Sequence, residues 1–287
     1  MITTLSPEER RRRRLATRNE YKLYRRTCDF SKKPIISTYS PNKKYTIYDA
    51  EIRRSDKRDP MTYGKDFDFT QAFFPQFDAL LKVVPLPAVQ TRQNENCPYV
   101  NSCGFTKDSY LSFNTDFSED CYYCNNALRS KYCFNVFNAE ECERCYDCYD
   151  IKRSEKIFFS NNIISSHALY FSQNCVGCSF CFGCKNLVNK QYCVFNKQVT
   201  KEEFDTIVAT YLNGTQSQCT AAQQQANDFH KTLPNKALEL ENTEKAYGHN
   251  LVNANNCTIV FDGANLENVS YSSVVNGTKT TRDFDFG

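Results

Sequence analysis

Residues 97–132 read CPYVNSCGFTKD SYLSFNTDFSED CYYCNNALRSKY, the first three rows of a twelve-residue array that continues without a gap to residue 204. Positions 1, 4, 7 and 10 of each row hold compact side chains, mostly Cys, Ser, Thr, Ala, Val or Ile, which are types that pack inside proteins. A fixed short period with one small residue in three indicates a solenoid. The array therefore predicts a mainly β fold, a narrow right-handed parallel β-helix with one coil per row.

A coil of two rows is the alternative, because CYYCNNALRS from Cys121 resembles CYDCYDIKRS from Cys145. The twelve-residue spacing itself resembles that of beetle antifreeze proteins, whose right-handed coils also point small side chains and Cys inward at three-residue intervals. At position 6 of the rows, Asn predominates from Asn114 to Asn186. Asn tolerates a left-handed backbone and its amides can stack, so we expect a corner and an amide ladder there.

Position 2 of the rows forms an aromatic stripe, because it holds Tyr or Phe in seven consecutive rows. If positions 1 and 4 point inward, position 2 points outward, and the stripe exposes more apolar area than soluble monomers usually do. We expect it to be covered by helices of residues 205–244, by the N-terminal module or by a partner protein. Stacked rings also bind single-stranded bases, although the array is not basic. The stripe consists of Tyr110, Tyr122, Phe134, Tyr146, Phe158, Tyr170 and Phe182.

The rest of the chain is organised around the array. Residues 1–60 predict a basic module with a helix and a β-hairpin that turns at Pro41. Residues 61–96 predict a linker with an amphipathic helix, Phe73 to Val83, that caps the first coil. Residues 205–244 predict a helical insertion of two helices, and the repeat resumes over 245–287 as a second solenoid block, truncated or uncapped at its end. Helix starts are expected at Ser6 and Thr200, each followed by Glu at the third position, which is a capping box.

Charge is distributed unevenly along the chain. Residues 1–60 carry 17 Lys and Arg against 8 Asp and Glu, whereas the remaining residues carry 19 against 25. A basic helix can contact phosphates by charge, so association with RNA or a ribosome is the first functional hypothesis. A solvated helix is the plainer interpretation. The candidate nucleic-acid-binding residues are Arg10, Arg11, Arg12, Arg13, Arg14, Arg18, Lys22, Arg25 and Arg26.

The sixteen cysteines allow two interpretations, a metal or redox site and the packing of buried thiols. No apolar leader or membrane span is seen, so we expect a cytoplasmic protein with reduced thiols rather than disulfides. Runs of Cys-x-x-Cys spacing resemble zinc ligands, and Cys175, Cys178, Cys181 and Cys184 are the best candidates for a metal or a redox thiol array. However, the coil period alone generates this spacing, and buried thiols behave as small hydrophobes. Packing without a cofactor is therefore the preferred interpretation.

Nothing in the sequence indicates catalysis. His167, His230 and His249 lie far apart in the sequence, and there is no phosphate-binding loop or dinucleotide fingerprint. We expect a non-enzymatic binding or scaffold protein. The alternatives to RNA association are metal or thiol chemistry and protein docking through the aromatic stripe.

Several strings of the sequence resemble an uncharacterised family of cysteine-rich repeat proteins from candidate-phylum bacteria. They include RRRLATRNEYKLYRRTCD, IISTYSPNKKYTIYD, SDKRDPMTYGKDFDF and GCKNLVNKQY. The resemblance implies a zinc-ribbon-like N-terminal part, which is degenerate here because only Cys28 of its cysteines is present. It also implies Trp where this chain has Arg53, Arg54 and Arg58, and it brings no established activity.

Overall fold

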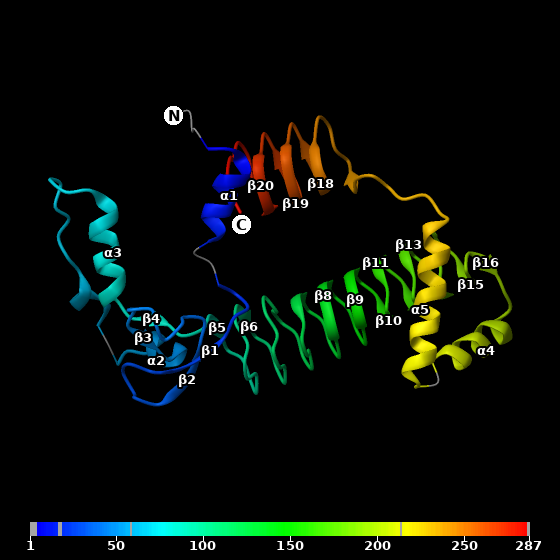
Figure 1. Ribbon diagram of the computed structural model, residues 1–287, viewed down its shortest axis with the longest axis horizontal. Coiled ribbons are helices and arrows are strands. Elements are labelled where there is room, and N and C mark those ends of the chain that lie inside the picture. The colour runs from blue at the N-terminus through cyan, green and yellow to red at the C-terminus, as the bar shows by residue number, and fades with distance from the viewer. Residues whose placement is uncertain (1–4, 17–18, 58, 213, 286–287) are drawn as a thin grey trace. The chain divides into compact units, whose positions relative to one another are not determined.

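The computed structural model describes residues 5–16, 19–57, 59–212 and 214–285. The chain divides into two compact units. The first unit comprises Met1–Arg18 with Pro234–Gly287, and the second comprises Asn19–Leu233. Both are built around parallel β-coils (Figure 1), so the mainly β solenoid predicted from the array is confirmed.

The first solenoid block has one coil per twelve residues. Ile163 pairs with Cys175 and Leu169 pairs with Cys181, and the same offset of twelve holds for the other parallel pairs of the block. This register excludes the coil of 24 residues, while the right-handed sense of the coil stays a prediction. The strands are β5 (Thr91–Arg92), β6 (Cys103–Gly104), β7 (Asn125–Leu128), β8 (Phe134–Glu140), β9 (Tyr146–Lys152), β10 (Glu155–Phe158), β11 (Asn161–Ile164), β12 (His167–Tyr170), β13 (Gln173–Val176), β14 (Ser179–Phe182) and β15 (Gln191–Val194).

Every third residue of this block adopts a left-handed backbone. The series runs from Gln93 to Tyr192 with φ near +50°, and glycines occupy it only at Gly177 and Gly183. The predicted corner at position 6 is confirmed, and so is its amide ladder, in which Asn126 Nδ2 donates to Asn138 Oδ1 at 2.7 Å. Positions 3, 9 and 12 turn in the same way, so each coil has four such corners. Tyr, Phe and Arg at these positions gave no sequence signal, because only Asn, Asp and Gly are enriched at positive φ.

Inward side chains satisfy the backbone as well as filling the coil. Ser112 Oγ donates to the carbonyl oxygens of Tyr110 at 3.2 Å and Cys121 at 2.9 Å. Cys142 Sγ does the same toward Glu140 and Ile151, both at 3.2 Å. Ser, Thr and Cys thus exchange in these positions because each is small and each carries one donor. All sixteen cysteines are free thiols.

The N-terminal module of the second unit pairs differently from the predicted hairpin. The two runs around Pro41 do not pair with each other. Strand β1 (Tyr24–Thr27) pairs antiparallel with β2 (Pro34–Ser37), and β3 (Ile47–Tyr48) pairs parallel with β4 (Leu86–Pro87). Two short helices, α2 (Ala50–Arg54) and η1 (Pro60–Tyr63), follow β3.

The predicted helix α3 (Phe73–Val83) forms with the expected bounds but does not cap the first coil. None of its residues is buried, and it stands clear of the coils in Figure 1. The module continues the coil instead, because Ala88 is hydrogen-bonded to both Tyr48 and Thr38. Strand β5 pairs with β6 at the same offset of twelve, Thr91 with Cys103, so the array begins one row before Cys97.

Two helices form in the region of the predicted insertion, but they span residues 201–231 rather than 205–244. Helix α4 (Lys201–Tyr211) starts at Thr200 with the complete capping box to Glu203, and α5 (Gln216–Lys231) follows it. The last predicted row, 193–204, is only partly solenoidal. After Val194 the chain folds back as β16 (Lys197–Gln198), antiparallel to β15, and then enters α4.

The first unit joins the two terminal regions of the chain. Its coils contain β17 (Leu240–Glu241), β18 (Tyr247–Asn255), β19 (Thr258–Glu267) and β20 (Ser270–Asn276). Helix α1 (Pro7–Leu15) packs on the last coil, where Arg10 binds the Asp283 carboxylate at 2.8 and 3.0 Å. The side chains of α1 thus contact the coil at which the sequence predicts an uncapped end, and that prediction stays open. The basic helix ends at Leu15, and the candidates Arg25 and Arg26 belong to β1.

Candidate functional site

The aromatic stripe lies on the outside of the coils, where it joins a second column at position 3. Along the middle coils Tyr122, Phe134 and Tyr146 stack in succession, and each is 38–40% exposed. Tyr123 fills the neighbouring column, with its ring 5.1 Å from that of Phe134. We call Tyr122, Tyr123, Phe134 and Tyr146 the exposed ladder. It is a continuous apolar strip, of the kind that marks interaction surfaces.

Further along the same two columns, the helical insertion covers the rings. Phe182 is 0% exposed and Phe171 is also buried. The Tyr211 ring of α4 lies 5.3 Å from the Phe182 ring, and Phe229 of α5 lies 5.5 Å from Phe195. We call Tyr170, Phe171, Phe182 and Phe195 the covered ladder. The two remaining residues of the aromatic stripe, Tyr110 and Phe158, are half-buried.

Two polar contacts fix the cover in place. Lys185 is buried, and its Nζ donates to the carbonyl oxygen of His230 at 3.0 Å, at the carboxyl end of α5. A cation is favourable there because the last helical carbonyls carry partial negative charge. The His230 ring lies 3.2 Å from the carbonyl oxygen of Gly183 through Nε2. Burial lowers the pKa of His230, so the ring is neutral in the native state.

A groove of about 440 Å³ runs beside the exposed ladder. Tyr123 and Phe159 line one side, and Phe137 and Tyr149 line the other, stacked with ring centroids 5.1 Å apart. Gln223 of α5 lines it too. The position-5 rings gave no stripe in the sequence, because this position holds Asn, Gln or Lys in the other rows.

Most of the described candidate residues for nucleic-acid binding are engaged within the protein. Arg10 pairs with Asp283, and Arg11 pairs with Asp285 at 3.7 Å. Arg12 and Arg13 both pair with the Glu9 carboxylate. The predicted capping box is therefore only half formed: Ser6 accepts from the Glu9 N–H, but the Glu9 side chain does not bond back to Ser6. These pairs lower the pKa of Glu9 to about 2.

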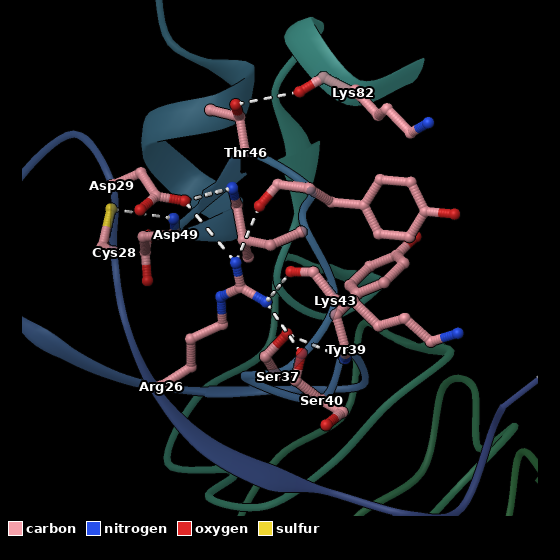
Figure 2. Close-up of polar contacts among 12 residues, drawn as sticks. Arg26, Cys28, Asp29, Ser37, Tyr39, Ser40, Lys43, Thr46, Asp49 and Lys82 are labelled. Atoms are coloured by element: carbon pink, nitrogen blue, oxygen red, sulfur yellow. Dashed lines mark hydrogen bonds and ion pairs between the residues drawn. The ribbon is translucent and has the colours of Figure 1, made fainter. Parts of the chain in front are cut away.

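The remaining basic candidates are scattered. Arg26 is half-buried and donates to the carbonyl oxygens of Ser40, Lys43 and Tyr45 (Figure 2). Arg25 is exposed, and Lys22 lies over the Tyr24 ring. Arg18 and the side chain of Arg14 lie outside the described residues. The candidates thus do not form one basic surface on α1.

The four candidate metal ligands occupy consecutive inward positions of one coil. Cys175, Cys178, Cys181 and Cys184 are all buried. In the part of the chain that the structure describes, no three His, Cys, Asp or Glu side chains are arranged to hold a metal ion. Burial raises the pKa of Cys103 and Cys148 to about 12, so those thiols are protonated at neutral pH. Metal and thiol chemistry stays a prediction, which metal analysis of protein purified under reducing conditions would test.

Cys28, the cysteine of the degenerate zinc-ribbon-like part, is buried. Its sulfur accepts from the backbone N–H of Ser31 at 3.4 Å. It also accepts from the backbone N–H of Asp49 at 3.3 Å (Figure 2). The three histidines are not brought together: His167 lies 3.6 Å from Glu155, and His249 Nδ1 accepts from the N–H of Glu239.

Comparisons with protein-family models, with curated proteins and with solved structures found no match for this chain. Among the described helices, none has the length and apolar character needed to cross a membrane.

Proposed function

We propose that this chain is a non-enzymatic scaffold that docks protein through the exposed ladder. The observation that carries the proposal is the continuity of the two ladders. Position 2 holds Tyr or Phe in every row from Tyr110 to Phe182. Helices α4 and α5 bury one part of this column, while Tyr122, Phe134 and Tyr146 lie open. Large aromatic rings left open beside buried ones are typical of binding hot spots, which bury Tyr and Phe at their centres.

The covered ladder indicates what kind of partner fits. The cover presents Phe204, Ala222 and Ala226 from two amphipathic helices, and these residues are buried against the rings. A helix with small and aromatic apolar side chains is therefore the complement of this surface. Helix-in-groove docking of this type is a common mode of recognition.

Helix α3 of the same chain is such a helix without a cover. Phe74 is 77% exposed, and Phe73, Phe77 and the preceding Phe69 are exposed as well. We therefore propose that the partner is a second copy of this chain, whose α3 packs on the exposed ladder. Because the two surfaces differ, the contact is heterologous, and it can close into a ring or extend into a chain.

Self-association tests the proposal directly. The double variant Tyr122→Ser with Tyr146→Ser removes two rings of the exposed ladder, and the full chain is examined by sedimentation velocity over a concentration series. We expect association of the unsubstituted chain and a monomeric variant. Tyr132→Ser is the matched control, because Tyr132 is an exposed ring on the same solenoid in a different column.

Mixing experiments identify the two halves of the contact. The variant Phe74→Ser with Phe77→Ser removes the α3 surface, and it should also be monomeric alone. Mixed with the ladder variant, it should form a one-to-one complex, because each supplies the surface that the other lacks. A monomeric unsubstituted chain, or a mixture that does not associate, would show that α3 is not the partner.

A further inference from the structure

A pocket of about 530 Å³ lies where the N-terminal module meets the first coils. Arg53 and Arg54 from the end of α2 line one side, and Arg92, Phe105 and Phe117 from the coils line the other. The volume lies within the roughly 300–1,000 Å³ typical of small-ligand sites. None of the candidate residues predicted from the sequence belongs to this pocket.

The pocket carries excess positive charge. Three guanidinium groups line it against the single carboxylate of Asp116. Neither Arg54 nor Arg92 forms an ion pair with any residue that the structure describes. Asp116 Oδ1 accepts from the Gly104 N–H at 2.6 Å, so this carboxylate is directed to the backbone. An anion is therefore the ligand charge that the site favours.

A flat stack stands beside these charges. The Arg92 guanidinium lies over the Phe105 ring at 5.4 Å, and Phe105 stacks on Phe117 with 4.9 Å between centroids and 3° between planes. Phe117 is 55% exposed. Aromatic rings and guanidinium planes together are a platform for nucleobases, and guanidinium also binds phosphate through paired donors.

We propose that this pocket binds a nucleoside monophosphate, either free or as the 5′-phosphorylated end of a single strand. The base packs against the exposed edges of Phe105 and Phe117, beside the Arg92 guanidinium, and the phosphate lies toward Arg54 and Arg53. An acidic peptide would satisfy the charge but would leave the stack unused. The site shares no residue with the exposed ladder or α3, so it does not depend on the proposed self-association.

Calorimetric titration of the full chain tests the requirement for both parts of the ligand. We expect AMP to bind at least about tenfold more tightly than adenosine or inorganic phosphate, since each lacks one of the two contacts. Equal affinity for AMP and inorganic phosphate would overturn the proposal, because the stack would then contribute nothing. Absence of AMP binding would overturn it as well.

Four variants locate the site. Arg54→Gln with Arg92→Gln should weaken AMP binding at least about tenfold, whereas Lys57→Gln, which removes an exposed charge of the same module outside the pocket, should not. Phe117→Leu leaves all three arginines and should weaken AMP but not phosphate. Asp116→Asn keeps an acceptor for the Gly104 N–H and should strengthen AMP binding by removing repulsion. Unchanged affinity in both the arginine pair and Phe117→Leu would place AMP elsewhere and reject this pocket.

The source of the nucleotide is distinguished by competition. A ten-nucleotide single-stranded RNA is offered with and without a 5′-phosphate. If the phosphorylated strand competes with AMP and the other does not, the ligand is a strand end. If neither strand competes but AMP binds with the variant pattern above, the ligand is the free nucleotide. If both strands bind equally and neither displaces AMP, the strand arm of the proposal is wrong.

Discussion

The exposed and covered ladders occupy the same two columns of one solenoid, yet their rings have opposite environments. Phe134 and Phe182 both stand at position 2 of a row, and one is 40% exposed while the other is 0% exposed. The coil determines only that these rings point outward. Whether a ring is buried depends on a segment outside the repeat, here α4 and α5. The comparison shows that a repeat can build an apolar surface that a segment outside the repeat covers over only part of its length.

The largest effect is expected when a ring of the covered ladder is removed. Phe182→Ala should lower the free energy of unfolding by about 3–5 kcal/mol, because it leaves a cavity under Tyr211. Phe134→Ala should cost much less, since water already reaches that ring. Urea denaturation followed by circular dichroism measures both. Similar costs at the two sites would show that the ladders do not differ in burial as described.

Alkaline pH should destabilise the first solenoid block through its buried thiols. Burial raises the pKa of Cys103 and Cys148 to about 12, above the usual thiol value. The native state keeps these protons while the unfolded state loses them, so stability falls as pH rises from about 9 toward 12. The loss should be on the order of 2 kcal/mol per thiol at pH 11.

Cys103→Ala with Cys148→Ala tests this explanation. The variant should have a flatter profile of melting temperature against pH than the unsubstituted chain. An equally steep fall would assign the alkaline transition to other groups.

Acid pH should loosen the cover alone. The pKa of His230 is lowered by burial, and the buried Lys185 ammonium nearby opposes a second positive charge. The stability that the neutral ring provides is present above its unfolded pKa and is lost as pH falls below about 6.5. Hydrogen exchange in α5 should therefore quicken at pH 5 relative to pH 7.5, after correction for intrinsic rates, while β8 and β9 stay protected. His230→Gln should remove the difference.

The smallest effect concerns a row of charges that leaves both ladders untouched. Glu119, Lys131 and Glu143 are neighbours on successive coils, with Lys131 Nζ 3.0 Å from Glu119. Lys131→Glu places three like charges in a row and should lower the melting temperature slightly, less so in high salt. Lys131→Gln is the control, and an equal fall in both variants would rule out charge as the cause.

The repeated part of the fold was predictable because each position of a row is sampled many times. Inward positions and the corner at Asn126 could be read from the residue types alone. The bounds of α3 were predictable from its apolar pattern and Pro85, but its packing was not, since an amphipathic face does not name its partner. The pairing of β3 with β4 was missed for a related reason: Ile47 and Leu86 are far apart in sequence and belong to no repeat.

The candidate sites were less predictable than the fold. The outward direction of Tyr122 follows from the period, whereas the cover over Phe182 depends on the tertiary packing of α4, whose Tyr211 ring lies on it. The arginine pocket combines Arg54 of a non-repetitive helix with Phe117 of a coil, and each is unremarkable in its own segment. The count of charges in the basic run does not reveal that Arg10 binds Asp283.

The contact between Arg10 and Asp283 also limits the order in which the two units can fold during synthesis. These residues are 273 positions apart, so α1 leaves the ribosome long before the coil on which it packs exists. At about 5–20 residues per second, the helix waits roughly a quarter of a minute to a minute for its partner. During that interval the coils of the second unit can form row by row, because each needs only its neighbours. The first unit is therefore completed last, although it contains the earliest helix of the chain.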